Sequence, residues 1–310
     1  MKKILIAGGT GYIGSQLYNS LKREYGVDTV DLEWFGNYSN KDNIVKDFSK
    51  MTKEEVSKYD VVILLAGHSG VKMCEGNMLP TMRNNVLNFV DLLDKIDKDQ
   101  TLIYASSSSV YGDTKELKVT EEYVGFEPNN FYDLSKYEID SYAKLSDKKS
   151  FGLRFGTVNG SSPNFRSDIM INAMTFNAKK NGKVFCFNPE IHRPILGILD
   201  LCGAIKRIID IGTHENKGIY NLCSFNTTAL EISTKVASLL GVPLEVIDKL
   251  PESVTNVKLQ TKAYNFMIDP SKFIQAFDFK FSETVETIVS SIVENFEEIN
   301  KDNRSNAKLY

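Results

Sequence analysis

The 310-residue chain lacks several features that mark secreted, membrane or nucleic-acid-binding proteins. Its four cysteines, at positions 74, 186, 202 and 223, have no paired spacing, which is typical of reduced thiols and predicts a cytoplasmic protein. The three histidines are scattered, so we expect no metal site. The 37 basic and 40 acidic residues are mixed, which argues against nucleic acid as a partner. No apolar run has the length of a signal-peptide core or a membrane span.

What the chain does have is 42% hydrophobic residues, enough for two lobes with cores of their own. Short apolar runs alternate with helical patterns, which favours an α/β fold with a doubly wound parallel sheet of the Rossmann type. We expect residues 1–156 and 195–223 to form this dinucleotide-binding domain. Residues 157–194 and 224–310 are expected to form a second, smaller substrate lobe, with the substrate between the two.

The chain is organised around a glycine-rich stretch close to its start. Ile4 to Ala7 is a short run with β-branched residues, suited to a buried strand, and a helical pattern begins after Gly14. Between them, Gly9, Gly11 and Gly14 fit the pattern G-x-G-x-x-G. Such glycines allow a tight turn and close approach to a pyrophosphate, which then faces the free N–H groups of the helix N-terminus. The stretch therefore predicts a dinucleotide site.

An acidic residue follows at the distance that this motif requires. Asp31 closes a second predicted strand, Asp28 to Leu32, and lies 20 residues past Gly11 (31 − 11). A carboxylate at this place accepts hydrogen bonds from the ribose hydroxyls of adenosine and repels a 2′-phosphate. Asp31 therefore favours NAD over NADP as the cofactor.

A tyrosine and a lysine stand four residues apart in the segment FYDLSK. On a helix, Tyr132 and Lys136 lie on one face, one turn apart. A nearby ammonium group favours the phenolate, which makes tyrosine usable as a general acid and base for a hydroxyl. The serine run 106–109, which follows a predicted strand, supplies a hydroxyl to orient the same oxygen. Such a pair occurs by chance in many helices, but together with the glycine turn and Asp31 it favours an active site.

At this point the sequence resembles the extended short-chain dehydrogenase/reductase family, in particular its nucleotide-sugar epimerases and dehydratases. The resemblance covers nearly the whole chain. Its motifs here are GGTGYIG at 8–14, Asp47-Phe48, Leu65-Ala66-Gly67, Asn84-Asn85-Val86, the serine motif at 106–112, Tyr132-x-x-x-Lys136 and Arg193-Pro194.

The resemblance implies a role for each matching residue. It makes Ser107, Tyr132 and Lys136 catalytic. The residues that it implies for NAD are Gly8, Gly11, Tyr12, Ile13, Gly14, Asp31, Asp47, Phe48, Leu65, Ala66, Gly67, Asn85, Tyr132 and Lys136. Those that it implies for a nucleotide-diphosphate sugar are Ser107, Ser108, Thr157, Asn172, Arg193 and Lys262.

The resemblance further implies an epimerase acting at C4 through a transient keto-sugar. Ser108 and Ser109 stand where the 4,6-dehydratases usually carry Asp-Glu, which argues against dehydration. A keto-sugar reductase or dehydrogenase with the same residues, and an NAD-binding sensor without activity, remain alternatives.

The family's two-fold dimer, built from two helices of each copy, is expected here as well. The apolar residues available for it are Val86, Phe89, Val90, Leu93, Ile139 and Tyr142.

Overall fold

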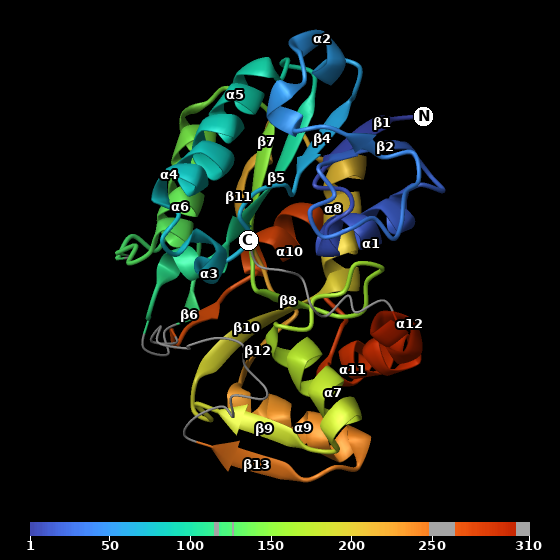
Figure 1. Cartoon of the computed structure of the whole chain (residues 1–310). Coiled ribbons are helices and arrows are strands. Elements are labelled where there is room, and N and C mark those ends of the chain that lie inside the picture. Colours follow the sequence, from blue (N-terminus) through green and yellow to red (C-terminus); the bar gives the residue numbers. More distant parts are fainter. Residues whose placement is uncertain (115–117, 126, 248–263, 302–310) are drawn as a thin grey trace.

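The computed structural model describes residues 1–114, 118–125, 127–247 and 264–301, and its larger lobe is built on a seven-stranded sheet (Figure 1). All neighbouring strands in this sheet run parallel, in the order β11-β7-β5-β4-β1-β2-β3. The strands are β1 (Lys3–Ala7), β2 (Gly26–Asp31), β3 (Ile44–Val45), β4 (Val61–Leu64), β5 (Thr101–Ser107), β7 (Ser150–Phe155) and β11 (Gly218–Leu222). The predicted doubly wound α/β fold is thereby confirmed.

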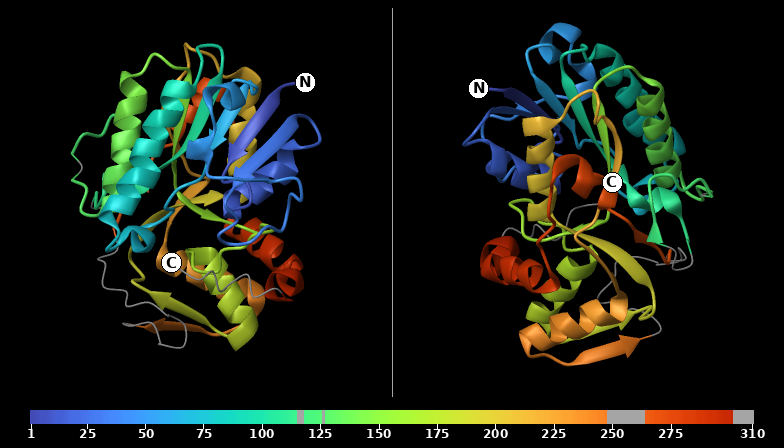
Figure 2. Two further views of the ribbon diagram at one scale, coloured as in Figure 1. Left: turned by 45° about the horizontal axis from the view of Figure 1, so that its top comes forward. Right: turned by 180° about the vertical axis from the view of Figure 1, so that it is seen from behind.

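Helices cover both faces of the large sheet, because its central strands are apolar on both sides (Figure 2). One core contains residues of α1 (Tyr12–Leu21), α8 (Ile198–Ile211) and α10 (Ser271–Phe277). The other contains residues of α2 (Lys53–Val56), α5 (Asn88–Lys95) and α6 (Phe131–Leu145). The short helix α2 begins with a capping box, in which Thr52 and Glu55 satisfy each other's backbone N–H groups.

The chain reverses its direction across the sheet beside β1. It runs outward through β2 and β3, and then returns to β4 on the other side of β1. The carboxyl ends of β1 and β4 therefore diverge at a switch point, where ligands bind in doubly wound folds. The glycine turn and the segment after β4 both lie at this edge.

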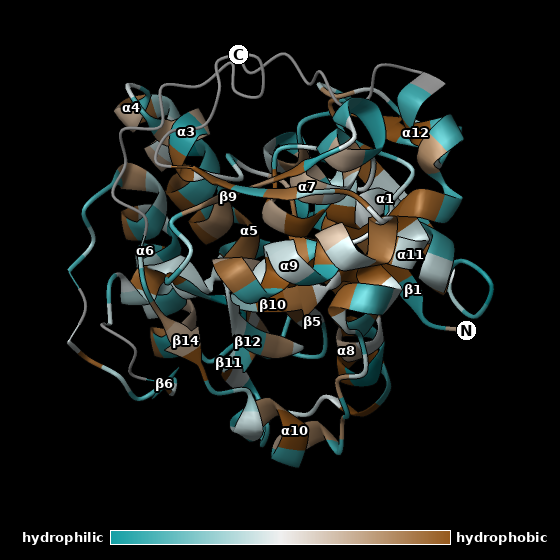
Figure 3. Cartoon of the chain, turned by 90° about the horizontal axis from the view of Figure 1, so that it is seen from below, coloured by the Kyte–Doolittle hydropathy of each residue, from teal (hydrophilic) through white to brown (hydrophobic). Residues whose placement is uncertain are grey.

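The second lobe has two small sheets and its own core. One sheet consists of β8 (Thr157–Asn159), β10 (His192–Gly197) and β12 (Phe225–Thr228), and the other pairs β9 (Val184–Phe187) with β13 (Leu244–Ile247). The helices α7 (Met170–Asn181), α9 (Ala229–Leu240) and α11 (Val285–Glu294) pack together beneath the large sheet (Figure 3). Together with α12 (Phe296–Lys301), they form a core that includes the apolar stripe of residues 285–296.

Two segments belong to a different lobe from the one in which the sequence pattern predicts them. The strand β10 belongs to the small sheet of the second lobe, although residues 195–223 were expected in the large domain. The helix α10 packs on the large sheet, although residues 224–310 were expected in the substrate lobe. The reason is that Phe273 and Phe277 fill the apolar space beside β11. The chain thus crosses between the lobes more often than the sequence pattern indicates.

Residues 78–95 form one continuous helical segment, in which α4 (Met78–Thr81) leads through a π-helical stretch (Met82–Leu87) into α5. Val86, Phe89 and Leu93 are buried in the core, as is Ile139 on α6, so these four residues do not form a free dimer surface. Tyr142, also expected at the dimer contact, is exposed, and the other exposed apolar residues on these helices are Met78, Leu79, Leu87, Phe131, Tyr137 and Leu145. The homodimer itself stays a prediction. Within the described segments, no helix combines the length and apolar character needed to cross a bilayer.

Candidate active site

The glycine turn is shaped by contacts that leave no room for a side chain. Gly8 has φ +88°, and a Cβ there would lie 2.5 Å from the backbone nitrogen of Ala66. A Cβ on Gly14 would lie 2.1 Å from the carbonyl oxygen of Gly8. Gly11 is the N-cap residue of α1. Because it has no side chain, it forms no side-chain hydrogen bond to the first N–H groups of this helix. This cradle fits the pyrophosphate of a dinucleotide.

Asp31 lies next to this cradle, at the end of β2. One carboxylate oxygen accepts a hydrogen bond from the backbone N–H of Thr10 (3.1 Å), and the other accepts from the backbone N–H of Glu33 (2.8 Å). The glycine turn and the carboxylate are thus held together by the backbone. This placement is the one that recognition of an adenosine ribose requires.

Several residues predicted to contact NAD also have structural partners. The Tyr12 hydroxyl donates to the carbonyl of Gly160 (2.9 Å), which ties the glycine motif to the second lobe. Ile13 packs against the core on one face of the large sheet, and Leu65 and Ala66 both donate backbone N–H groups to the carbonyl of Ala7. These contacts fix the edge on which the cofactor is expected to lie.

Four further predicted cofactor residues, Asp47, Phe48, Gly67 and Asn85, have defined structural contacts. Asp47 caps the short turn Phe48–Lys50, and the Phe48 ring is buried in the core. Asn85 accepts a hydrogen bond from the backbone of His68 (2.8 Å) and donates to the Ser135 hydroxyl (3.0 Å). A Cβ on Gly67 would lie 2.7 Å from the Asn85 side-chain oxygen. Asn85 therefore fastens the loop after β4 to helix α6.

The structure brings the three predicted catalytic residues together at the carboxyl edge of the sheet. Ser107 is the last residue of β5. Tyr132 and Lys136 lie on α6, which begins directly after its N-cap residue Asn130. The Ser107 hydroxyl lies near enough to the Tyr132 phenol to lower the pKa of that phenol. The Lys136 Nζ donates to the carbonyl of Ala105 (2.7 Å) and lies 5.8 Å from the centre of the Tyr132 ring.

Burial has the largest effect on the pKa values of Tyr132 and Lys136. It raises the pKa of Tyr132 to about 12, with a further rise from Asp133 and partial lowering by Ser107 and Arg166. Burial also lowers the pKa of Lys136 to about 8. The expectation that a lysine would shift this tyrosine toward phenolate is therefore outweighed in the free protein. The reason is that both groups lose hydration on the same buried helix face.

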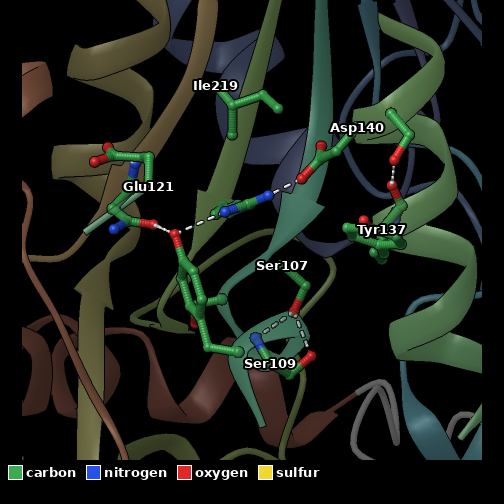
Figure 4. A network of polar contacts seen from close by, with 12 residues as sticks. Ser107, Ser109, Glu121, Tyr137, Asp140 and Ile219 are labelled. Atoms are coloured by element: carbon green, nitrogen blue, oxygen red, sulfur yellow. Dashed lines mark hydrogen bonds and ion pairs between the residues drawn. The ribbon is translucent and has the colours of Figure 1, made fainter. Parts of the chain in front are cut away.

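Two polar groups near Tyr132 carry no sequence motif and were missed. Asp133 accepts a hydrogen bond from Ser109, whose hydroxyl also contacts that of Ser107 (Figure 4). Arg166 lies in the irregular segment before α7 and forms a two-pronged ion pair with Asp168. The charge of Asp133 directly after Tyr132 was visible in the sequence, whereas the approach of Arg166 depends on the tertiary fold.

Two predicted substrate residues point into the protein instead. The Ser108 hydroxyl is buried and donates to the carbonyl of Phe155 (2.7 Å). The Asn172 side chain is fully buried, accepts from the backbone of Gly160 (2.8 Å) and donates to the carbonyl of Arg166 (2.9 Å). Because their polar atoms are used internally, we correct both assignments: these residues brace the site.

The remaining predicted substrate residues lie on the second lobe or outside the described residues. Thr157 begins β8 and is partly exposed, and Lys262 falls in a segment that the structure does not describe. The Arg193 guanidinium lies 5.7 Å from the centre of the Phe266 ring. Burial lowers its pKa to about 10, and the charge of Asp113 opposes this shift. Arg193 is thus a largely desolvated cation.

Comparison with known proteins agrees with this geometry. A 28% identical relative, Protein CapI of Staphylococcus aureus, aligns over 243 residues, or 69% of this chain and 71% of the relative. UDP-glucose 4-epimerase of Lactobacillus helveticus is 30% identical over 178 residues, so the match spans about half of each protein (52% and 53%).

Solved structures share the fold at low identity. UDP-glucose 4-epimerase of Thermotoga maritima, solved with UDP-glucose, superposes with a TM-score of 0.81 at 20% identity, covering 96% of this chain and 99% of that one. UDP-glucuronic acid 4-epimerase of Bacillus cereus, solved with UDP-glucuronic acid and NAD, gives 0.79 at 20% identity and the same coverage. Residues 4–223 match the model of the NAD dependent epimerase/dehydratase family. The chain therefore belongs to this family of nucleotide-sugar enzymes, whose cofactor is NAD.

Proposed function

We propose that the protein is an epimerase that inverts C4 of a nucleotide-diphosphate sugar through a transient keto-sugar. The observation that carries this proposal is the convergence of Ser107, Tyr132 and Lys136 beside the glycine turn, at the switch point of the sheet. Reversible oxidation of a sugar hydroxyl requires an acid–base group for its proton beside a bound dinucleotide that takes its hydride. The names of the UDP-sugar 4-epimerases among its relatives support the substrate class.

In this mechanism each residue has one task. Tyr132 takes the proton of the sugar hydroxyl and later returns it, while Ser107 hydrogen-bonds to the same oxygen. Lys136, fixed by the carbonyl of Ala105, binds the ribose next to the nicotinamide. When bound, NAD supplies the acceptor and donor of the hydride. The sugar must turn over in the site between the two proton transfers, so that its other face is reduced.

Arg193 is proposed to bind the diphosphate. A guanidinium that is partly desolvated against an aromatic ring gains more from a phosphate oxygen than one in water does. Its position on β10 of the second lobe supports a nucleotide bound on that lobe, with the sugar near Tyr132.

Dehydration is disfavoured by the residues after Ser107. Ser108 and Ser109 stand where the dehydratases carry an acid pair, and both hydroxyls are bonded within the protein. A serine hydroxyl at its ordinary pKa is a poor acid for the expulsion of water. We therefore place the reaction among the epimerisations.

The test measures which nucleotide the purified protein holds and whether the protein epimerises a nucleotide sugar without added cofactor. An epimerase recycles its cofactor, so heat denaturation is expected to release about one NAD per chain. NADP is not expected, because Asp31 would repel its 2′-phosphate. UDP-glucose or UDP-glucuronic acid should then be converted to its C4 epimer with no cofactor supplied. A protein without nucleotide that consumes added NADH would be a reductase, and one with NAD but no turnover a sensor.

A further inference from the structure

A buried arginine joins the turn that begins at Ser107 to the helix that carries Tyr132. Arg154 lies on β7 and is 7% exposed. Its Nε donates to a carboxylate oxygen of Asp140 on α6 (2.8 Å), a contact that Figure 4 shows. Its Nη1 donates to the hydroxyl oxygen of Tyr111 (2.8 Å), which lies in the turn after β5. One guanidinium therefore contacts both structural elements of the proposed active site.

Ser107 and Tyr111 are the two ends of one tight turn. Ser107 is the N-cap residue of the short 3-10 helix Ser108–Tyr111, and its side chain accepts from the backbone N–H of Ser109 (3.2 Å). A 3-10 turn is tightly wound, so its two ends move together. A displacement of Tyr111 therefore also displaces the Ser107 hydroxyl.

The other side of the connection lies on the catalytic face of α6. Tyr132, Lys136 and Asp140 follow one another at intervals of four residues, so their side chains share one face of the helix. Asp140 is 2% exposed, and its second carboxylate oxygen accepts from the hydroxyl of Tyr104 (3.1 Å). With the guanidinium on its first oxygen, Asp140 holds this face of α6 against the sheet.

The Tyr111 hydroxyl both accepts and donates inside the protein. It accepts from Arg154 and donates to the side-chain oxygen of Asn221 on β11 (2.8 Å). The Asn221 amide is itself fixed by the carbonyl groups of Val119 (3.3 Å) and Asp269 (3.2 Å). The Tyr111 ring is 2% exposed, and the guanidinium carbon lies 4.9 Å from its centre. Because a buried cation that loses a hydrogen-bond acceptor is costly, the guanidinium keeps the phenol in place.

We propose that Tyr111 and Arg154 are positioning residues of the active site. They hold the Ser107 hydroxyl where it and the Tyr132 phenol reach the same sugar oxygen. This inference rests on the proposed oxidation of a sugar hydroxyl at that place. Proton transfer and orientation by a hydroxyl both need hydrogen-bond distances, which a displacement of about 1 Å destroys. Both positioning side chains are buried and bonded within the protein, so their effect on the reaction passes through Ser107.

Tyr111→Phe removes one oxygen and keeps the ring. It cuts the contact of Arg154 with the turn and leaves the ion pair with Asp140 in place. The turnover number (kcat) for UDP-glucose or UDP-glucuronic acid should fall about tenfold, because the Ser107 hydroxyl is less firmly held. The KM for the sugar nucleotide and the amount of retained NAD should stay close to the wild-type values. Ser107→Ala removes the hydroxyl itself and should lower kcat about a hundredfold.

The variant that combines both substitutions separates positioning from a general structural role. If Tyr111 acts through Ser107, Tyr111→Phe should lower kcat no further once Ser107 is replaced by alanine. A purely structural role predicts the same tenfold loss with serine or alanine at position 107. The reason is that a smaller amount of folded enzyme lowers turnover whichever side chain stands there.

Tyr59→Phe is the matched control. Tyr59 is 8% exposed, and its hydroxyl donates to the carboxylate of Asp28 (2.9 Å). It precedes β4 and so lies at the amino end of that strand, whereas the proposed active site lies at the carboxyl edge of the sheet. This variant also loses a buried phenol oxygen that contacts a charged group. Its thermal midpoint should fall about as much as that of Tyr111→Phe, while its kcat is kept.

The inference is supported if Tyr111→Phe is about tenfold slower than the wild type and the loss disappears in the Ser107→Ala background. It is overturned, with the proposed function intact, if Tyr111→Phe keeps the wild-type kcat, loses the same factor in both backgrounds, or is matched by Tyr59→Phe. If the wild type converts neither sugar nucleotide, the proposed C4 oxidation of these sugars and the positioning role both fall.

Should Tyr111→Phe not fold, Arg154→Lys takes its place in the same comparison. A lysine keeps a positive charge beside Asp140 but lacks the planar fork that also reaches Tyr111. A loss of kcat confined to the chain that has Ser107 supports the positioning role, and a loss of equal size in both backgrounds overturns it.

Discussion

Tyr132→Phe is expected to lower turnover by about a hundredfold or more while the protein still folds and binds NAD. The substitution removes one oxygen and keeps the ring, so packing along α6 is preserved. What disappears is the group that exchanges a proton with the sugar hydroxyl. Turnover of UDP-glucose or UDP-glucuronic acid, together with the thermal midpoint and the amount of NAD retained, measures all three consequences.

Tyr142→Phe provides the matched control for this substitution. Tyr142 lies on the same helix but is 47% exposed, so the loss of its hydroxyl should leave turnover unchanged. If Tyr132→Phe kept most of its activity, or if the two variants behaved alike, Tyr132 would not be the acid and base of the reaction.

Asp140→Ala is expected to reduce the free energy of unfolding by about 3–5 kcal/mol, because it leaves a buried cation without its partner. Asp140 lies one turn beyond Lys136 and accepts a hydrogen bond from the Arg154 guanidinium at 2.8 Å (Figure 4). Their side chains are only 2% and 8% exposed, and Tyr104 also donates to Asp140 at 3.1 Å. Urea unfolding, followed by circular dichroism, measures the loss.

Two further variants show whether this loss of stability is specific to a buried ion pair. Asp140→Leu combined with Arg154→Met removes both charges and should recover most of the lost stability. Asp91→Ala breaks an exposed ion pair with Lys95, four residues on, and should change stability by only about 0.2–1 kcal/mol. A loss for Asp140→Ala no larger than that of Asp91→Ala would show that the pair does not hold α6 to the sheet.

The parts of the fold that sequence predicts well are those set by local patterns. Runs such as Ile4 to Ala7 are buried on both faces and form strands wherever the sheet lies. The helix after Gly14 and the helix that carries Tyr132 follow from spacing and from a cap at Asn130. In the same way, the family motifs led to the trio of serine, tyrosine and lysine.

The parts that sequence could not predict depend on where side chains point after distant segments meet. Ser108 and Asn172 matched a substrate pattern, yet both are turned inward because Phe155 and Gly160 offer them backbone partners. The neighbours Ser109 and Asp133 are 24 residues apart in sequence. No periodicity in either segment indicates their contact.

The most direct test of the proposed reaction is the fate of the hydrogen on C4. The protein, with no cofactor added, is incubated with UDP-glucose or UDP-glucuronic acid that carries deuterium at C4, and the products are examined by mass spectrometry and nuclear magnetic resonance. Transient oxidation with return of the hydride to the same carbon predicts a C4 epimer that keeps its deuterium at C4. A product that has lost the deuterium to solvent, or one that has lost water, would contradict the account.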